Sequence, residues 1–226
     1  TAKNCTRNRK TNGEAMKIAL FGGTFNPPHL GHRRLLDSFC SLLPFDRVFV
    51  VPDKRPVHKI CDDLALDNER LQMCRLAFDD PAFTVSSMEI DRESDSYTVY
   101  TVRELQAQYP DAEIYLLMGS DMFLSFHKWY KYREIFEKCT LCVASRQDED
   151  DLQALRSYAF KTLRVYIPQN KTADEHLLFS PVEPFEISSS ELREKLSKGE
   201  DASEYLAPAV LDYIRTRGMY GYPKKR

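Results

Sequence analysis

Short apolar runs alternate along the chain with amphipathic stretches, and the change of period between them predicts strands and helices. Apolar or alternating runs predict strands at residues 16–21, 47–52, 83–90, 112–119, 140–145 and 164–167. Apolar positions at helical spacing, with caps and prolines as boundaries, predict helices at residues 30–43, 67–78, 96–110 and 187–196. A last helix is expected between Pro208 near its start and Gly218 just past its end.

The helix predicted at residues 67–78 has Asp67 as its expected N-cap, and Ser188 with Glu191 predicts a capping box at the next-to-last helix. Strands that alternate with helices predict βαβ units, which assemble into a parallel sheet through right-handed crossovers. We therefore expect an α/β fold in a single domain over residues 16–220. Residues 1–15 are expected to be an extension, disordered or left from cloning, and residues 221–226 a basic tail.

Composition excludes some classes of partner. The formal net charge of −2 gives no basic field that would attract nucleic acid, and no run is apolar and long enough to span a membrane. The residues before Met16 lack the apolar segment of a signal peptide. Six cysteines are scattered, and Cys139 and Cys142 lie in a predicted buried strand, where they are expected to pack as small apolar side chains. Reduced thiols and the lack of an export signal predict a cytoplasmic location.

A phosphate-binding turn is predicted directly after the first strand. Gly22, Gly23 and Thr24 stand where a parallel sheet binds ligands, beyond the carboxyl end of a strand. Two glycines let backbone N–H groups approach an anion, and the N-terminus of the following helix points at the same place. The turn lacks the G-K-[ST] of a Walker A loop and is not G-x-G-x-x-G. Glycines in this pattern also occur in ordinary tight turns.

Two histidines strengthen the prediction of a phosphate site. His29 and His32 are three residues apart, so they share one face at the start of a helix. Beside a turn that can cradle an anion, two imidazoles are best explained as donors to phosphate oxygens. A zinc pair is the alternative, but neither an H-E-x-x-H motif nor a third ligand stands nearby in the sequence.

These residues carry a resemblance to a known family. The stretch "GGTFNPPHLGH" (22–32) resembles the (H/T)xGH signature of the nucleotidylyltransferase superfamily, and "ISSSELREKL" (187–196) resembles its C-terminal signature, I-S-S-T-x-I-R. Between them, "SYTVYTVRELQ" (96–106) and "MGSDMFLSFHKWYKYREI" (118–135) are similar to the bacterial nicotinate-nucleotide adenylyltransferase family. The resemblance extends from Met16 to Tyr220 and implies a Rossmann-like, doubly wound parallel sheet.

The resemblance also implies a reaction. The 5′-phosphate of nicotinate mononucleotide attacks the α-phosphorus of ATP, pyrophosphate leaves, and deamido-NAD forms in NAD biosynthesis. The cofactor implied is Mg²⁺, bridging the triphosphate without ligands from protein side chains. ATP and nicotinate mononucleotide are then the small-molecule partners, and the sequence leaves the oligomeric state open, a homo-oligomer included.

Site residues are carried over from the family position by position. The resemblance assigns catalysis to His29, His32 and Arg193. It assigns ATP binding to these three and to Gly22, Gly23, Thr24, Phe25, Gly119, Asp121, Ile187, Ser189 and Ser190. It assigns nicotinate mononucleotide binding to Asn26, His58, Lys59, Tyr97, Thr98, Trp129 and Arg146.

Several of these residues also have a structural interpretation. Arg193 fits a solvated helix position, Asp121 fits an N-cap, and Trp129, the one tryptophan, fits a core position in a helical stretch. Three positions depart from the family pattern. Ser190 replaces a threonine but keeps its hydroxyl, Val57 replaces a proline in the loop 53–59, and Asp53 or Lys54 replaces an asparagine earlier in that loop.

Two other functions stay open at this point. A sister transferase acting on nicotinamide mononucleotide or phosphopantetheine would share both signatures. A non-catalytic nucleotide sensor would keep the binding residues without turnover.

Overall fold

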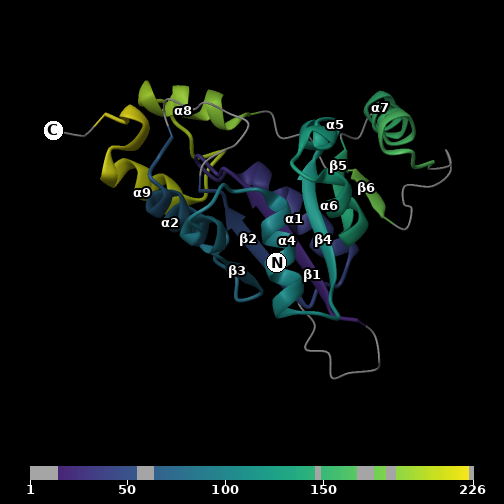
Figure 1. The fold of residues 1–226 in the computed structure, drawn as a ribbon. Helices are drawn as coiled ribbons and strands as arrows, with labels where there is room; N and C mark the ends of the chain where they lie inside the picture. Colours follow the sequence, from purple (N-terminus) through teal and green to yellow (C-terminus); the bar gives the residue numbers. More distant parts are fainter. Residues whose placement is uncertain (1–14, 55–63, 146–148, 167–175, 182–186, 224–226) are drawn as a thin grey trace. The chain divides into compact units, whose positions relative to one another are not determined.

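The computed structural model describes residues 15–54, 64–145, 149–166, 176–181 and 187–223. Within these residues six strands form one hydrogen-bonded sheet in the order β3-β2-β1-β4-β5-β6 (Figure 1). The strands are β1 Lys17–Gly23, β2 Arg47–Pro52, β3 Phe83–Val85, β4 Glu113–Gly119, β5 Cys139–Ser145 and β6 Leu177–Pro181. This is the strand order of a doubly wound α/β fold, in which winding reverses between β1 and β4. The fold class expected from the sequence, a single α/β domain, is confirmed.

Helices separate most of the strands along the chain. They are α1 Leu30–Leu42, α2 Asp67–Ala77, α3 Met88–Asp91, α4 Thr98–Gln108, α5 Ser120–Leu124, α6 Tyr132–Lys138, α7 Glu149–Tyr158, α8 Ser189–Ser197 and α9 Pro208–Arg217, with short turns of other helix types at η1 Phe126–Lys128, η2 Ala159–Leu163 and η3 Met219–Gly221. The contacts of the domain group into two compact units. The first holds the described residues of Thr1–Gly22, Leu35–Phe49 and Tyr97–Pro184, and the second those of Gly23–Arg34, Val50–Ser96 and Phe185–Arg226.

The first unit is built around three parallel pairings, β1 with β4, β4 with β5, and β5 with β6. Ile18 faces Ile114 in the register of β1 and β4, and both side chains are buried. β1 and β4 are nearly continuous apolar runs because both faces of a parallel sheet are covered. Since these two strands are adjacent and parallel, they end at the same edge of the sheet.

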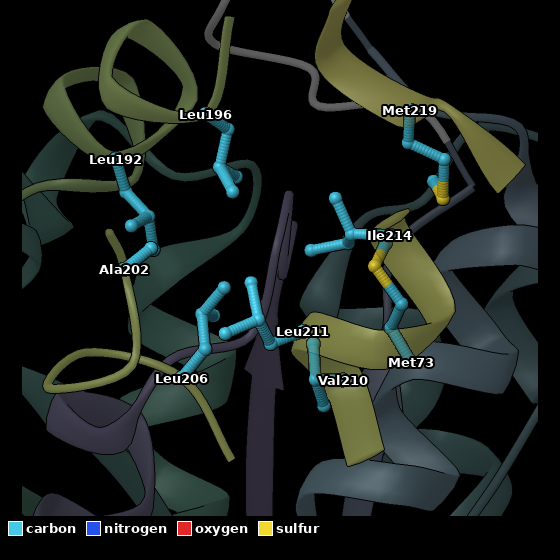
Figure 2. Close-up of a cluster of buried hydrophobic side chains, with 9 residues drawn as sticks. All are labelled: Met73, Leu192, Leu196, Ala202, Leu206, Val210, Leu211, Ile214 and Met219. Atoms are coloured by element: carbon cyan, nitrogen blue, oxygen red, sulfur yellow. The ribbon is translucent and has the colours of Figure 1, made fainter. Parts of the chain in front are cut away.

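The second unit has its own apolar core, which Figure 2 shows as nine side chains directed toward one another. Met73 comes from α2, Leu192 and Leu196 come from α8, and α9 contributes Val210, Leu211 and Ile214. The cluster is completed by Ala202, Leu206 and Met219. Leu192 and Leu196 are four residues apart, so one stripe of α8 faces the core while the opposite stripe stays free for other contacts.

Caps fix the ends of α8 and α9 as the sequence predicts. The Ser188 hydroxyl accepts a hydrogen bond from the Glu191 backbone N–H at 3.2 Å, and the Glu191 carboxylate accepts from the Ser188 N–H at 2.7 Å. This is the predicted capping box. Pro208 begins α9, and Gly218 ends it with φ 65°, a left-handed conformation that glycine adopts at low cost.

Four local predictions are wrong. The strand expected at 83–90 ends at Val85, because Ser86 and Ser87 bond to the backbone or side chains of the turn that becomes α3. No strand forms at the described residues 164–166, where Arg164 takes φ 64° and Val165 N–H bonds back to Ala159. The strand that pairs with β5 is instead β6.

The other two concern helix ends. The N-cap of α2 is Leu66, and Asp67 lies inside the helix, where its carboxylate pairs with Arg70. Trp129 does not lie in a helix, because η1 ends before it and α6 begins at Tyr132.

The thiols also depart in part from expectation. Cys139 and Cys142 are buried in β5 as free thiols, and burial raises the pKa of each to about 12. Cys74 is likewise buried and free, whereas Cys40 is disulfide-bonded. Within the part of the chain that is described, no helix is both long and apolar enough to cross a membrane.

Candidate functional site

The end of β1 opens the candidate site. The turn expected at Gly22 and Gly23 is not formed there, because both glycines are still strand residues and Thr24 is the first residue after β1. A Cβ atom on Gly23 would approach the Phe25 ring to 3.2 Å, so any larger residue here would push the ring outward by a few tenths of an ångström. Phe25 has φ 48° and a buried ring, which packs edge-on against His32 and Phe78 at 5.1 and 5.7 Å between centroids. The ring therefore anchors the turn, and an ATP contact at Phe25 would use its backbone.

The two histidines meet where α1 begins. His29 precedes the helix, and its carbonyl accepts hydrogen bonds from the backbone N–H groups of His32 and Arg33. The His29 N–H donates to Nδ1 of His32 at 3.1 Å, and the ring centroids are 3.7 Å apart. Because Nδ1 of His32 is an acceptor, the proton of the neutral ring is on Nε2. His32 therefore offers Nε2–H as a donor.

Both imidazoles favour the neutral form in the absence of a ligand. Burial lowers the pKa of His29 to about 4. Burial and the neighbouring His29 lower the pKa of His32 well below its usual 6.5. Two positive charges stacked at this distance would repel each other, whereas a bound anion would favour protonation. The pair can therefore respond to a phosphate by donating hydrogen bonds and by gaining positive charge.

A buried arginine that was missed in the sequence holds the turn in place. Arg70 on α2 has no exposed surface, and its Nη1 donates to the Thr24 carbonyl at 2.7 Å and to the Asp53 carboxylate at 3.0 Å. Its Nη2 donates to the Asp67 carboxylate at 2.6 Å and to the Asp53 carbonyl at 2.5 Å. The Thr24 hydroxyl also donates to Asp53, at 2.9 Å. Arg70 thus links the glycine turn, the end of β2 and α2.

Asn26 is a second buried link. Its carboxamide oxygen accepts hydrogen bonds from the Ala65 backbone N–H at 3.1 Å and from the Tyr220 hydroxyl at 2.8 Å. The Asn26 side chain is 2% exposed, and burial raises the pKa of Tyr220. The side-chain oxygen of Asn26, a residue that the resemblance assigns to the mononucleotide, is therefore engaged in linking Tyr220 to the backbone at residue 65.

The second signature lies against the first within the same unit. Arg193 Nη1 donates to the Asn26 carbonyl at 3.0 Å, and the Ser189 hydroxyl lies 3.5 Å from the Pro27 carbonyl. Arg193 Nη2 lies 3.4 Å from the Ser190 hydroxyl, one turn back on α8. The structure thus brings together a guanidinium, serine hydroxyls and a helix N-terminus next to the segment that leads into the histidines. Ile187 lies just before the Ser188 cap, half-buried against the apolar cluster.

A cavity of about 860 Å³ adjoins α8 in this unit. Ser190 and Arg193 line it, as do Glu69 of α2 and Arg217 at the end of α9. Two guanidinium groups face a space large enough for a polyphosphate chain, and two carboxylates, those of Glu69 and Glu194, share its wall. The cavity is continuous with the signature residues and belongs to the same candidate site.

The predicted adenosine residues follow β4 in the first unit. Gly119 is the last residue of β4 and the N-cap of α5, and a Cβ atom there would lie 2.8 Å from the Asp121 carboxylate. Asp121 is exposed in the first turn of α5, so it is not the N-cap. A glycine and an exposed carboxylate at the end of a strand are suited to accept ribose hydroxyls.

The predicted acceptor residues also lie in the first unit. Tyr97 is the N-cap of α4, and Thr98 is its first residue, so the backbone N–H groups of the first turn point away from the helix. Trp129 is half-buried in the link between η1 and α6, with its ring 5.4 Å from Phe126. Three predicted acceptor residues, His58, Lys59 and Arg146, lie outside the described residues, so their roles stay predictions.

Comparison with known proteins places this site in context. The profile of the cytidylyltransferase-like family matches residues 20–195. A probable nicotinate-nucleotide adenylyltransferase of Lachnoclostridium phytofermentans is 34% identical over 90% of this chain and 98% of its own length. One of Geobacter sulfurreducens is 35% identical over 92% and 99% of the two chains.

Solved structures share the fold. Plasmodium falciparum nicotinic acid mononucleotide adenylyltransferase, complexed with NaAD, superposes with a TM-score of 0.73 at 17% identity, over 93% of this chain and all of its own. The same protein complexed with APC gives a TM-score of 0.71 at 17% identity with the same coverage. At this identity the likeness bears on the fold alone, and the two signatures bear on the chemistry.

Proposed function

This chain belongs to the cytidylyltransferase-like family, and we propose that it acts there as a nicotinate-nucleotide adenylyltransferase. It transfers the adenylyl group of ATP to nicotinate mononucleotide, forming nicotinate adenine dinucleotide and pyrophosphate in NAD biosynthesis. The observation that carries the proposal is the contact between the two signatures. Arg193 donates a hydrogen bond to the Asn26 carbonyl, and the Ser189 hydroxyl donates one to the Pro27 carbonyl.

The reaction asks for positioning and charge stabilisation. The phosphate of nicotinate mononucleotide is already an anion at neutral pH, so no side chain needs to remove a proton from it. One of its oxygens forms a bond to the α-phosphorus of ATP, while the bond from that phosphorus to the bridging oxygen breaks and pyrophosphate leaves. Charge builds up on the leaving group, and fixed donors lower the barrier by stabilising it.

The second unit supplies such donors. We assign Nε2–H of His32 and the ring of His29 to the triphosphate, because both imidazoles lie at the start of α1. Arg193 and the N-terminus of α8 are assigned to the β- and γ-phosphates. Backbone N–H groups of Gly22 and Gly23, at the end of β1, and of Thr24 are assigned to the phosphates as well, and Arg70 holds the Thr24 carbonyl in place.

The donor set of this site fits a phosphate better than a metal ion. It consists of imidazole and guanidinium N–H groups and hydroxyls, and the carboxylate nearest the turn, Asp53, is engaged by Arg70 and Thr24. Among the described residues no group of three or more histidine, cysteine, aspartate or glutamate side chains could hold a metal. Mg²⁺ would therefore arrive bound to ATP phosphates, where it neutralises part of their charge.

The acceptor is assigned to the first unit. The pyridine ring stacks on Trp129, and its carboxylate accepts hydrogen bonds from the first backbone N–H groups of α4, near Tyr97 and Thr98. A carboxylate has acceptors only, whereas the amide of nicotinamide would direct an NH₂ group at one of these donors. The acid is therefore preferred over the amide by roughly 10²- to 10⁴-fold in kcat/KM.

One assay tests this function against its alternatives. Pyrophosphate release is measured with ATP and Mg²⁺ and with each acceptor in turn: nicotinate mononucleotide, nicotinamide mononucleotide and phosphopantetheine. The proposal requires turnover with the first and a far lower kcat/KM with the others. Equal kcat/KM for acid and amide would reject the acid-specific assignment, and binding of ATP without turnover of any acceptor would favour a sensor. The cytoplasmic location expected from the sequence stays a prediction.

A further inference from the structure

Three tyrosines cluster at the start of α4 in the first unit. The rings of Tyr97 and Tyr130 are 4.7 Å apart between centroids, and Tyr100 packs edge-on against both, at 6.0 and 6.1 Å. Tyr130 is 43% exposed and comes from the link between η1 and α6. An aromatic side chain at this exposure is not a core residue, and its ring lies against the N-cap residue of another helix.

An ion pair joins the same two segments one turn further along. Arg103 of α4 donates through Nε and Nη2 to the two carboxylate oxygens of Glu134 of α6, at 2.8 and 2.7 Å. The two parallel bonds fix the relative orientation of both side chains, which a single contact would not do. The Arg103 guanidinium also lies 5.7 Å from the centre of the Tyr100 ring. Rings and charges together form a continuous clamp between α4 and the segment 129–134.

This clamp spans the two parts of the acceptor site proposed above. One end is Tyr97, whose neighbouring N–H groups receive the carboxylate. The other end is Tyr130, which directly follows Trp129, the stacking platform. Residues 129–131 form no helix, and Lys131 has φ 52°. Backbone hydrogen bonds hold this link locally, from the Trp129 N–H to the Phe126 carbonyl at 2.9 Å and from the Tyr132 N–H to the Trp129 carbonyl at 3.1 Å. These bonds stay within residues 126–132, so the ring contact with Tyr97 is what attaches the link to α4.

We propose that Tyr130 is a positioning residue for the acceptor, which sets the distance between the indole of Trp129 and the start of α4. The Arg103–Glu134 pair is the second attachment of the same clamp. The inference rests on the proposed function, because it makes the clamp responsible for part of the affinity for the pyridine mononucleotide. A site held in its bound geometry loses less entropy on binding. Loosening the clamp therefore weakens binding of the acceptor and leaves binding of ATP unchanged.

The test compares Tyr130→Ala and Tyr130→Phe with the wild-type protein. Tyr130→Ala removes the ring and is expected to raise the KM for nicotinate mononucleotide roughly 3- to 10-fold, with the KM for ATP within about twofold. Tyr130→Phe keeps the ring and loses only the side-chain hydrogen bond with Tyr100, so its acceptor KM is expected to stay within about twofold of the wild type. Tyr166→Ala is the matched control, because Tyr166 is a 67% exposed tyrosine of the same unit that contacts Phe160. The control should leave both KM values unchanged.

Fluorescence gives a readout that does not depend on turnover. Trp129 is the one tryptophan of the chain, so its emission reports the link directly. Tyr130→Ala is expected to make Trp129 at least twofold more accessible to acrylamide quenching, and Arg103→Gln to shift it in the same direction. Neither Tyr130→Phe nor Tyr166→Ala should change it.

The outcomes separate this inference from the proposed function. If wild-type protein makes no dinucleotide, the proposed function fails, while acrylamide quenching still tests the clamp. Two results overturn the inference: an acceptor KM within twofold of wild type in folded Tyr130→Ala, or a parallel rise of both KM values with a lowered melting temperature. If Tyr130→Ala fails to fold, the same KM comparison in Arg103→Gln, which replaces a part-exposed side chain, decides the question.

Discussion

Replacement of Arg70 by methionine is expected to be among the most destabilising single changes in the second unit. The side chain has no exposed surface and donates six hydrogen bonds, to Ala65, Thr24, Lys54 and Asp67 and twice to Asp53. Methionine fills a similar volume but can donate none of these hydrogen bonds. Breaking one side of a buried ion pair costs about 3–5 kcal/mol, since the remaining charge loses its partner in a poorly solvated site.

That loss is a large fraction of the roughly 5–15 kcal/mol by which domains of this kind are stable. Urea unfolding at neutral pH measures it, with Arg75→Met as the matched control. Arg75 lies on the same helix but is exposed, so its replacement should change the free energy of unfolding by less than about 0.5 kcal/mol. Arg70→Lys should recover only part of the loss, because an ammonium cannot reproduce the planar fork.

The pH dependence of the free energy of unfolding shows whether the loss comes from the ion pair between Arg70 and Asp53. Burial raises the pKa of Asp53 above its usual 3.8, and Arg70 partly opposes this rise. In Arg70→Met the cation is gone, so the pKa of folded Asp53 rises further. Because this folded-state pKa lies above that of the unfolded chain, the variant loses stability as the carboxyl ionises with rising pH. The difference in stability between Arg70→Met and wild type should therefore be smaller near pH 4 than at pH 7. A loss below about 1 kcal/mol at pH 7, equal to that of Arg75→Met, would refute the assignment of Arg70 as a buried hub.

Three further predictions concern the residues that we assign to the ATP phosphates. Burial lowers the pKa of His29 to about 4 and that of His32 well below 6.5, so between these values the unfolded chain binds protons that the folded protein does not. The ligand-free protein should therefore lose stability as pH falls from 6.5 toward 4, by roughly 3 kcal/mol for His29. Unfolding in urea at pH 7.5 and pH 5 measures this, and the double variant His29→Gln/His32→Gln should show a smaller difference. His32→Ala should fold and lose roughly 10²- to 10³-fold in kcat, which single-turnover kinetics would measure and a near wild-type rate would contradict. Arg193→Lys should raise the KM for ATP roughly 10- to 100-fold while titrated binding of nicotinate mononucleotide stays unchanged; equal loss of both would indicate a general structural defect.

The parts of the fold that could be predicted are those whose cause is local. β1 and β4 are continuous apolar runs between turn residues, and the capping box at Ser188 and the proline and glycine at the ends of α9 are local signals as well. β6 was missed because its strand identity depends on pairing with β5, which the sequence does not display. The stretch 164–167 has the right alternation, yet its described residues form no strand.

The same distinction holds for the candidate site. His29, His32 and Arg193 could be proposed as site residues because they stand in short segments with recognisable spacing; the structure shows their positions, and their roles stay predictions. Arg70 could not, because a charged residue within a helix is usually solvated, and its partners Thr24 and Asp53 are 46 and 17 residues away. One signal was available: Arg70 lies three and four residues before Met73 and Cys74, on the buried face of α2.

The hydrogen bond between Tyr220 and Asn26 connects residues 194 positions apart. During synthesis on a ribosome, the first signature emerges early, but the tyrosine that holds its asparagine emerges only when translation is nearly finished. An incomplete chain therefore lacks the hydrogen bond that holds Asn26. We expect nascent or truncated chains that end before Met219 to bind ATP weakly.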